Sequence, residues 1–270
     1  MSLLLCRQEH VTRPFYAEEM GIRIYSSQEL SYVIVHYPLL VMDGFVSDAL
    51  LNFLREELNH GFLALKIERW QKSGENPDET LVMILQECDY CTGAQISRFR
   101  QTVADIRKKH PAEYRKLKAD EFFAIRQYRR ALELYQELAD WKADSVVDDH
   151  FRACVLNNMG SCYARMFRLE EAFDAYSRSY AAWNQQSVLE RIYYLSKLDA
   201  GLKPGEWQKF KITPELQEKW DADMEAARQR AAGSEAAGQL EVLFKRDLPR
   251  RQEGEAKWIA KWKQEYRSMM

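Results

Sequence analysis

Apolar residues recur at intervals of three and four along most of this chain, with polar residues between them. Leu156, Met159 and Tyr163 show the spacing, and it places their side chains on one face of a helix. Glycine and proline are few, at 11 and 7 of 270 residues, which disfavours a turn-rich β protein. The pattern therefore predicts an all-α fold.

The first part of the chain, residues 1–109, shows signals for about five short helices. Ser26 and Glu29 have the spacing of a capping box, and the helix that they open should end before Pro38. The apolar run at 32–35 leaves a strand as the alternative for this segment. We expect residues 1–109 to form an N-terminal helical bundle.

Two helices, one around 156–163 and one around 172–179, are predicted with a turn between them at 165–169. Gly160 falls on the apolar face of the first helix, where a missing side chain lets another helix cross closely. Since glycine in a helix interior costs about 1 kcal/mol relative to alanine, close packing is a good reason for its presence. On the returning helix, Ala172 and Tyr176 repeat the combination of a small and a large residue.

A weaker copy of this pattern lies 41 residues upstream. Its members are Ala119, Phe122, Ala131, Tyr135 and Leu138. The two copies resemble the tetratricopeptide repeat, a helix-turn-helix unit of about 34 residues that stacks on copies of itself. The longer offset predicts about two extra helical turns around 140–149. A further helix over 187–198 should cover the open end of the stack.

The resemblance covers about residues 111–198. It implies an α-solenoid of tetratricopeptide-like helical hairpins at 110–200, between the N-terminal bundle and a C-terminal helical tail at 201–270. It also implies a non-catalytic adaptor or scaffold that binds a protein segment or peptide in a concave groove. A turn-rich break at 199–205 separates the repeats from the tail.

In the resembled family, the first helix of each unit lines the groove. Alignment of the repeats gives the inward positions as Lys116, Asp120, Phe123, Asn157, Asn158, Ser161, Arg165 and Arg191. Some family members hold the C-terminal carboxylate of heat-shock chaperones at such places, and Lys116, Asn158 and Arg191 match that pattern. Asp120 and Leu195 depart from it, so the clamp is incomplete. A groove for an extended or helical peptide, or a solvated helix surface, remain alternatives.

The tail begins with a charged helix predicted for 213–232, followed by a flexible linker predicted for 233–238. A final amphipathic segment carries Trp258, Trp262 and Tyr266 at four-residue spacing among basic residues. Three interpretations are open: docking in the protein's own groove, binding a partner's groove, or lying on an anionic membrane surface. Docking in its own groove would make the protein a peptide- or tail-regulated switch that controls a partner, including a transcriptional one. Homo-oligomerisation through the tail is a further option.

The formal net charge is −2, so the whole molecule has no electrostatic reason to bind nucleic acid or anionic lipid. No apolar run approaches the roughly 20 residues that a membrane span needs. The apolar start, Met1–Cys6, is too short for a signal peptide. With five cysteines and no disulfide framework, we expect a cytoplasmic protein with reduced thiols.

Cys88 and Cys91 form a C-x-x-C pair, which leaves a redox or metal protein as a lower alternative. The pair lacks a βαβ context, and zinc needs four ligands where the sequence offers one pair. Phosphate-binding loops and the common hydrolase and metalloprotease motifs do not occur in the sequence. We therefore expect no enzyme, no cofactor and no metal.

Overall fold

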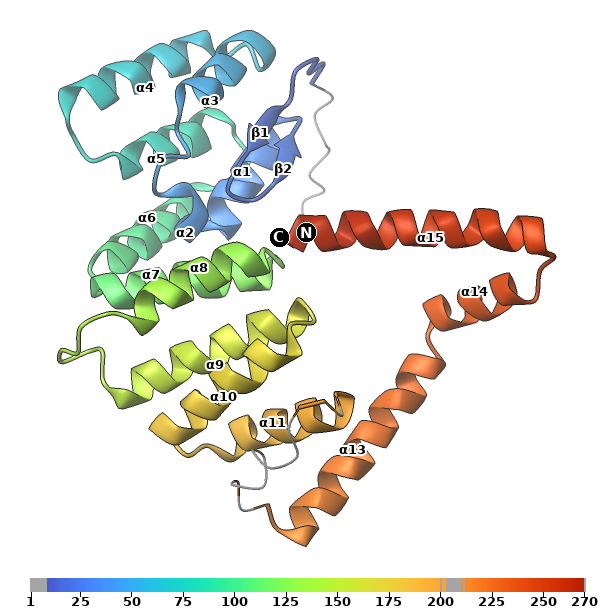
Figure 1. The fold of residues 1–270 in the computed structure, drawn as a ribbon. Helices are drawn as coiled ribbons and strands as arrows, with labels where there is room; N and C mark the ends of the chain where they lie inside the picture. Colours follow the sequence, from blue (N-terminus) through green and yellow to red (C-terminus); the bar gives the residue numbers. More distant parts are fainter. Residues whose placement is uncertain (1–8, 200, 203–209, 211, 270) are drawn as a thin grey trace. The chain divides into compact units, whose positions relative to one another are not determined.

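The computed structural model describes residues 9–199, 201–202, 210 and 212–269 (Figure 1). These residues form fourteen α-helices and one short two-stranded sheet, so the predicted all-α class is confirmed. The chain divides into two compact units, Met1–Ile125 and Arg126–Met270. The division falls within the predicted repeat region. The apolar start and most of the predicted break at 199–205 lie outside the described residues.

The first unit contains the sheet and seven α-helices. Its elements are β1 (Phe15–Ala17), β2 (Ile22–Ile24), α1 (Ser27–His36), α2 (Pro38–Val41), α3 (Asp48–Asn52), the π-helical turn η1 (Phe53–Glu57), α4 (Gly61–Ser73), α5 (Asp78–Glu87), α6 (Gly93–Arg107) and α7 (Pro111–Ala124). Ser26 caps α1 by accepting a hydrogen bond from the Glu29 amide at 3.1 Å, so helix rather than strand is confirmed there. Gly74, with φ +73°, ends α4 in the left-handed conformation that favours glycine.

The antiparallel hairpin β1–β2 was not predicted, and it corrects the expectation of a purely helical first region. Phe15 pairs with Ile24, and Ala17 with Ile22. Gly21 closes the connecting turn at φ +68°. Each strand has three residues, which is too short for an alternating pattern to stand out in the sequence.

The second unit begins with four helices that lie side by side in Figure 1. They are α8 (Tyr128–Ala139), α9 (Asp149–Arg165), α10 (Leu169–Ala182) and α11 (Gln186–Leu198). The helix expected at 187–198 is therefore present. Each helix packs against the next one in the chain.

The contact between α9 and α10 is very close. A Cβ atom added at Gly160 would lie 2.6 Å from two carbons of the Tyr176 ring, far inside van der Waals contact. The buried Ser179 hydroxyl donates a 2.7 Å hydrogen bond to the Ala153 carbonyl across the same pair of helices. The start of α9 thus meets the end of α10, which means that the helices run antiparallel.

The turns before α8 and α10 share an uncommon backbone conformation. Arg126 has φ +65°, and Phe167, 41 residues later, has φ +57°. Non-glycine residues adopt such angles infrequently. The left-handed turn residue therefore recurs at the same 41-residue offset as the two copies of the side-chain pattern.

The extra residues between the two copies correct the prediction of extra helical turns. Residues 140–148 form a loop rather than a helix. Asp144 accepts hydrogen bonds from the amides of Val146 and Val147 at 2.8 and 2.7 Å, and Asp148 caps α9. Aspartate side chains that bind nearby amides in this way compete with helix formation.

Three further helices follow, namely α13 (Pro214–Ala232), α14 (Glu235–Phe244) and α15 (Leu248–Met269). The linker predicted at 233–238 is wrong in part, because Ser234 accepts a hydrogen bond from the Ala237 amide and starts α14. A serine cap can open a helix even where the composition is rich in small residues. None of the helices in the described part of the chain combines the length and the apolar character needed to cross a bilayer.

Helix α13 packs on α11 through one large side chain. Trp220 is 1% exposed and contacts Leu189 and Tyr193, with its ring 5.4 Å from the Tyr193 ring. Asp221 accepts a 2.8 Å hydrogen bond from the Tyr193 hydroxyl and pairs with Lys197 at 3.2 Å. These contacts cover α11, the helix that was expected to close the stack.

We predict that Trp220→Ala lowers the free energy of unfolding of the second unit by about 3–5 kcal/mol, because it leaves a cavity between α11 and α13. Trp183→Ala is the matched control, since Trp183 is 48% exposed and should cost less than about 1 kcal/mol. Urea unfolding followed by circular dichroism measures both. Equal costs for the two variants would contradict the proposed role of Trp220.

Candidate functional site

Helix α9 presents a polar face opposite the residues that it buries. Asn157, Asn158, Ser161 and Arg165 follow one another at intervals that keep them on one side of the helix. The first three are half-buried and Arg165 is exposed, whereas Met159 and Gly160 are buried. We call these four residues the α9 polar face.

Hydrogen bonds connect the α9 polar face to the helices on either side. The side-chain NH2 group of Asn158 donates to the Tyr135 hydroxyl of α8 at 3.2 Å, and that of Asn157 donates to the side-chain oxygen Oδ1 of Asn158 at 3.2 Å. From α11, Arg191 donates to the side-chain oxygen Oδ1 of Asn157. The chain of bonds fixes both asparagine side chains and orients the Arg191 guanidinium.

Tyr176 of α10 also contacts this network. Its hydroxyl lies 3.1 Å from the Ser161 hydroxyl, and the Arg191 guanidinium carbon is 5.8 Å from its ring centroid. Burial raises the pKa of Tyr176, which outweighs the lowering by the Ser161 hydrogen bond and by the charges of Arg191 and Arg165. The hydroxyl therefore stays protonated and remains a hydrogen-bond donor.

The two arginines give this surface a positive charge. Arg191 is exposed although it bonds to Asn157. Arg165 is exposed and makes no ion pair with any described residue. Two guanidinium groups beside fixed amides and hydroxyls suit carboxylate or phosphate oxygens, because arginine offers several donors in a planar arrangement.

The other predicted site residues lie on α7 in the first unit. Lys116 pairs with Asp120 of the same helix at 2.8 Å, and Phe123 is half-buried. The Lys116 ammonium group therefore already has an anionic partner on its own helix. Leu195, at the position where the resembled clamp has a second basic residue, is 4% exposed and belongs to the core of the second unit. Five of the eight predicted residues are brought together, namely Asn157, Asn158, Ser161, Arg165 and Arg191.

Sequence reasoning missed the tyrosines that complete this network. Tyr135 and Tyr176 occupy equivalent positions in the two copies and were assigned only to packing. Each ring is buried, yet each hydroxyl contacts the α9 polar face. The signal that could have revealed this is the amphipathic nature of tyrosine, which buries its ring and keeps its hydroxyl bonded.

A cysteine and a histidine extend the same side of α9. Cys154 and His150 are one helical turn apart, with the sulfur 3.8 Å from the histidine Nε2, and the His150 ring packs edge-on against Trp183. In the first unit, Cys88 is buried, and burial raises the pKa of Cys91. No cluster of three or more metal-binding side chains occurs among the described residues.

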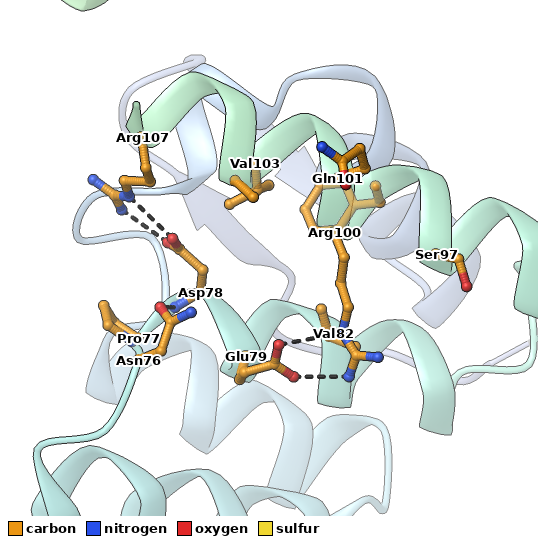
Figure 2. A pocket seen from close by; sticks show the side chains of 12 residues that line it. Asn76, Pro77, Asp78, Glu79, Val82, Ser97, Arg100, Gln101, Val103 and Arg107 are labelled. Carbon is orange, nitrogen blue, oxygen red and sulfur yellow. Dashed lines mark hydrogen bonds and ion pairs between the residues drawn. The ribbon is translucent and has the colours of Figure 1, made fainter. Parts of the chain in front are cut away.

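A pocket of about 730 Å³ lies between α5 and α6 in the first unit (Figure 2). Figure 2 shows two arginine–carboxylate pairs that join these helices, Arg107 with Asp78 and Arg100 with Glu79, both at 2.8 Å. Val82, Val103 and Phe99 contribute its apolar lining. Because its charged groups already have partners, the pocket has a clear structural role in joining α5 to α6.

Arg107 is the centre of a larger network in this unit. It bonds to Asp78, to Asp43 at 3.0 Å and to the Met42 carbonyl at 3.2 Å, while Tyr114 of α7 donates to Asp43. Burial alone would raise the pKa of Asp43, but the hydrogen bonds from Tyr114 and Arg107 outweigh it and hold that pKa below its usual value. The network connects α5, α6, α7 and the segment after α2.

A second hollow of about 780 Å³ runs along β2 and α1. Its aromatic lining consists of Tyr25, Tyr32, Tyr37 and Tyr90. Sequence reasoning did not find this hollow because the hairpin that forms one wall was not predicted.

Comparison with protein-family models, with curated protein sequences and with solved structures finds no match to this chain.

We predict that Arg107→Met destabilises the first unit by about 1–3 kcal/mol, because it leaves the Asp78 carboxylate, whose side chain is 10% exposed, without its charged partner. Arg100→Met removes a more exposed pair and should cost at most about 1 kcal/mol. Thermal or urea unfolding of each variant gives the comparison. A cost for Arg107→Met no larger than that for Arg100→Met would show that the network is not needed for stability.

Proposed function

We propose that this protein is a non-catalytic adaptor whose second unit binds an acidic segment of another protein along the α9 polar face. The observation that carries this proposal is the set of bonds from Tyr135 through Asn158 and Asn157 to Arg191. Arg165 lies on the same face and makes no ion pair within the described part of the chain. Donor groups that are fixed before binding lose little freedom when a ligand arrives, so they favour affinity.

We propose further that the helices around this face form a tetratricopeptide-like solenoid. Two observations support it: the left-handed turn residues Arg126 and Phe167 are 41 residues apart, and Gly160 meets Tyr176 at very close range. In such stacks each unit contacts its neighbours, and the stacked helices offer a preformed surface for an elongated ligand.

Charge favours an acidic ligand over a basic or neutral one. Arg165 and Arg191 both lie close enough to Tyr176 to influence its pKa. The positive charge of the two arginines would repel a basic peptide. An aspartate, a glutamate or a C-terminal carboxylate would instead gain charge-assisted hydrogen bonds. The partly exposed amides and hydroxyls beside the arginines suit main-chain groups of an extended peptide.

A binding role also agrees with the chemistry of the network. Asn157, Asn158 and Ser161 are bonded to one another or to tyrosine hydroxyls, and among the described residues the Ser161 hydroxyl bonds only to the Asn157 carbonyl and the Tyr176 hydroxyl, neither of which is a general base. Nucleophilic catalysis by serine needs such a base within hydrogen-bonding distance. We therefore propose that the arginines hold a ligand and that no bond is made or broken there.

We predict that Arg165→Glu weakens binding of acidic peptides about tenfold or more, since it replaces a charge-assisted hydrogen bond with repulsion. The measurement uses an array of peptides of equal length that carry either aspartate and glutamate or lysine, with free or amidated C-termini. Asn158→Ala should also weaken binding, because it breaks the connection between Tyr135 and Asn157.

Arg178→Glu is the matched control, because it makes the same charge change on α10, where Arg178 is exposed and 3.6 Å from Asp174. Binding should be retained in this variant. Wild-type protein that shows no preference for acidic peptides, or an Arg165→Glu variant that binds as wild type does, would contradict the proposed site.

A further inference from the structure

Large apolar side chains are exposed in unusual number on α15. Ile259, Trp262 and Tyr266 are 48%, 47% and 44% exposed, and Leu248 at the start of the helix is exposed as well. Soluble proteins expose single apolar residues freely, but a contiguous set on one helix marks an interaction surface. The aromatic side chains Trp258, Trp262 and Tyr266 follow one another at four-residue spacing, and we call them the aromatic stripe.

Helix α14 covers only the first half of α15. Leu243 of α14 packs against Gly254 so tightly that a Cβ at Gly254 would collide with it. Arg251 lies 4.5 Å from the Phe244 ring centroid and pairs with Glu255 at 2.7 Å. Trp262 and Tyr266, one and two turns beyond Trp258, keep close to half of their surface exposed, and Tyr266 lies close enough to Arg168 of α10 to interact with its charge.

Positive charge flanks the aromatic stripe on both sides. Lys261 and Lys263 precede and follow Trp262, so each lies about 100° around the helix from it. Residues 257–269 contain four basic residues and one acidic residue, which gives a local net charge of +3 in a protein whose total is −2. Lys263 makes no ion pair with any described residue.

The aromatic stripe and the lysines beside it indicate what kind of surface α15 binds. A second copy of the chain would bring lysine against lysine around the stripe, so charge disfavours self-association. Tryptophan and tyrosine combine an apolar ring with a polar edge and are enriched where membranes meet water. Lysine stems can lie along the apolar region while their ammonium groups reach lipid phosphates.

We propose that the C-terminal half of α15 binds the surface of an anionic lipid bilayer, with the aromatic stripe inserted at headgroup depth and Lys261 and Lys263 beside it. Helices with one aromatic face and basic flanks lie in the plane of the interface and do not cross the membrane. This binding is independent of the α9 polar face, and it would bring the peptide-binding unit to a membrane.

Co-sedimentation of the full chain with sucrose-loaded vesicles tests the proposal. Vesicles of phosphatidylcholine containing phosphatidylglycerol should bind the protein about tenfold or more strongly than phosphatidylcholine alone. Added salt should weaken the binding, and tryptophan emission should shift to shorter wavelength on binding. Trp262→Ala with Tyr266→Ala, and separately Lys261→Glu with Lys263→Glu, should each abolish most of the binding.

Two control variants separate this surface from general effects. Arg228→Glu with Arg230→Glu makes the same charge change on exposed positions of α13, and Trp183→Ala removes an exposed aromatic side chain elsewhere; both should bind vesicles as wild type does. Wild-type protein that stays in the supernatant with both kinds of vesicle would overturn the proposal and leave a partner protein's groove as the occupant. Lysine or aromatic variants that bind as wild type does would overturn it as well.

Discussion

The close contact between Gly160 and the Tyr176 ring is the constraint on which the second unit depends. An added Cβ atom would lie 2.6 Å from ring carbons of a buried side chain that has little room to move. Because the helices approach so closely, Ser179 can reach the Ala153 carbonyl and the Tyr176 hydroxyl can reach Ser161. One missing side chain therefore determines both how α9 packs on α10 and which groups support the α9 polar face.

The polar face in turn links packing to binding. Tyr135 and Tyr176 each bury a ring in the core and present a hydroxyl to α9, so the positions of Asn158 and Ser161 are set by the same contacts that stabilise the unit. Arg191 is exposed and is oriented by its hydrogen bond to Asn157. A surface supported in this way can hold a ligand without reorganising, which is why we place the binding site there.

Local signals in the sequence predicted much of this structure, and contacts across the fold supplied the rest. The cap at Ser26, the close approach at Gly160 and the helix over 214–232 follow from residue chemistry within one or two turns. The hairpin β1–β2 was missed because three-residue strands show no period, and α14 because its small residues resemble a linker. Five of the eight predicted site residues gather on α9 and α11. The ion pair of Lys116 with Asp120 was missed although its four-residue spacing on one helix could have indicated it.

A double-mutant cycle between positions 160 and 176 tests the central constraint most directly. Gly160→Ala in the wild-type background should destabilise the protein by about 1–3 kcal/mol, because the new methyl group collides with the ring. In a Tyr176→Ala background the same substitution should be neutral or stabilising by about 0.5–1 kcal/mol, since alanine favours helix over glycine once the ring is gone. Urea unfolding of the four proteins gives the coupling free energy. An equal cost of Gly160→Ala in both backgrounds would show that the contact does not govern the packing of α9 on α10.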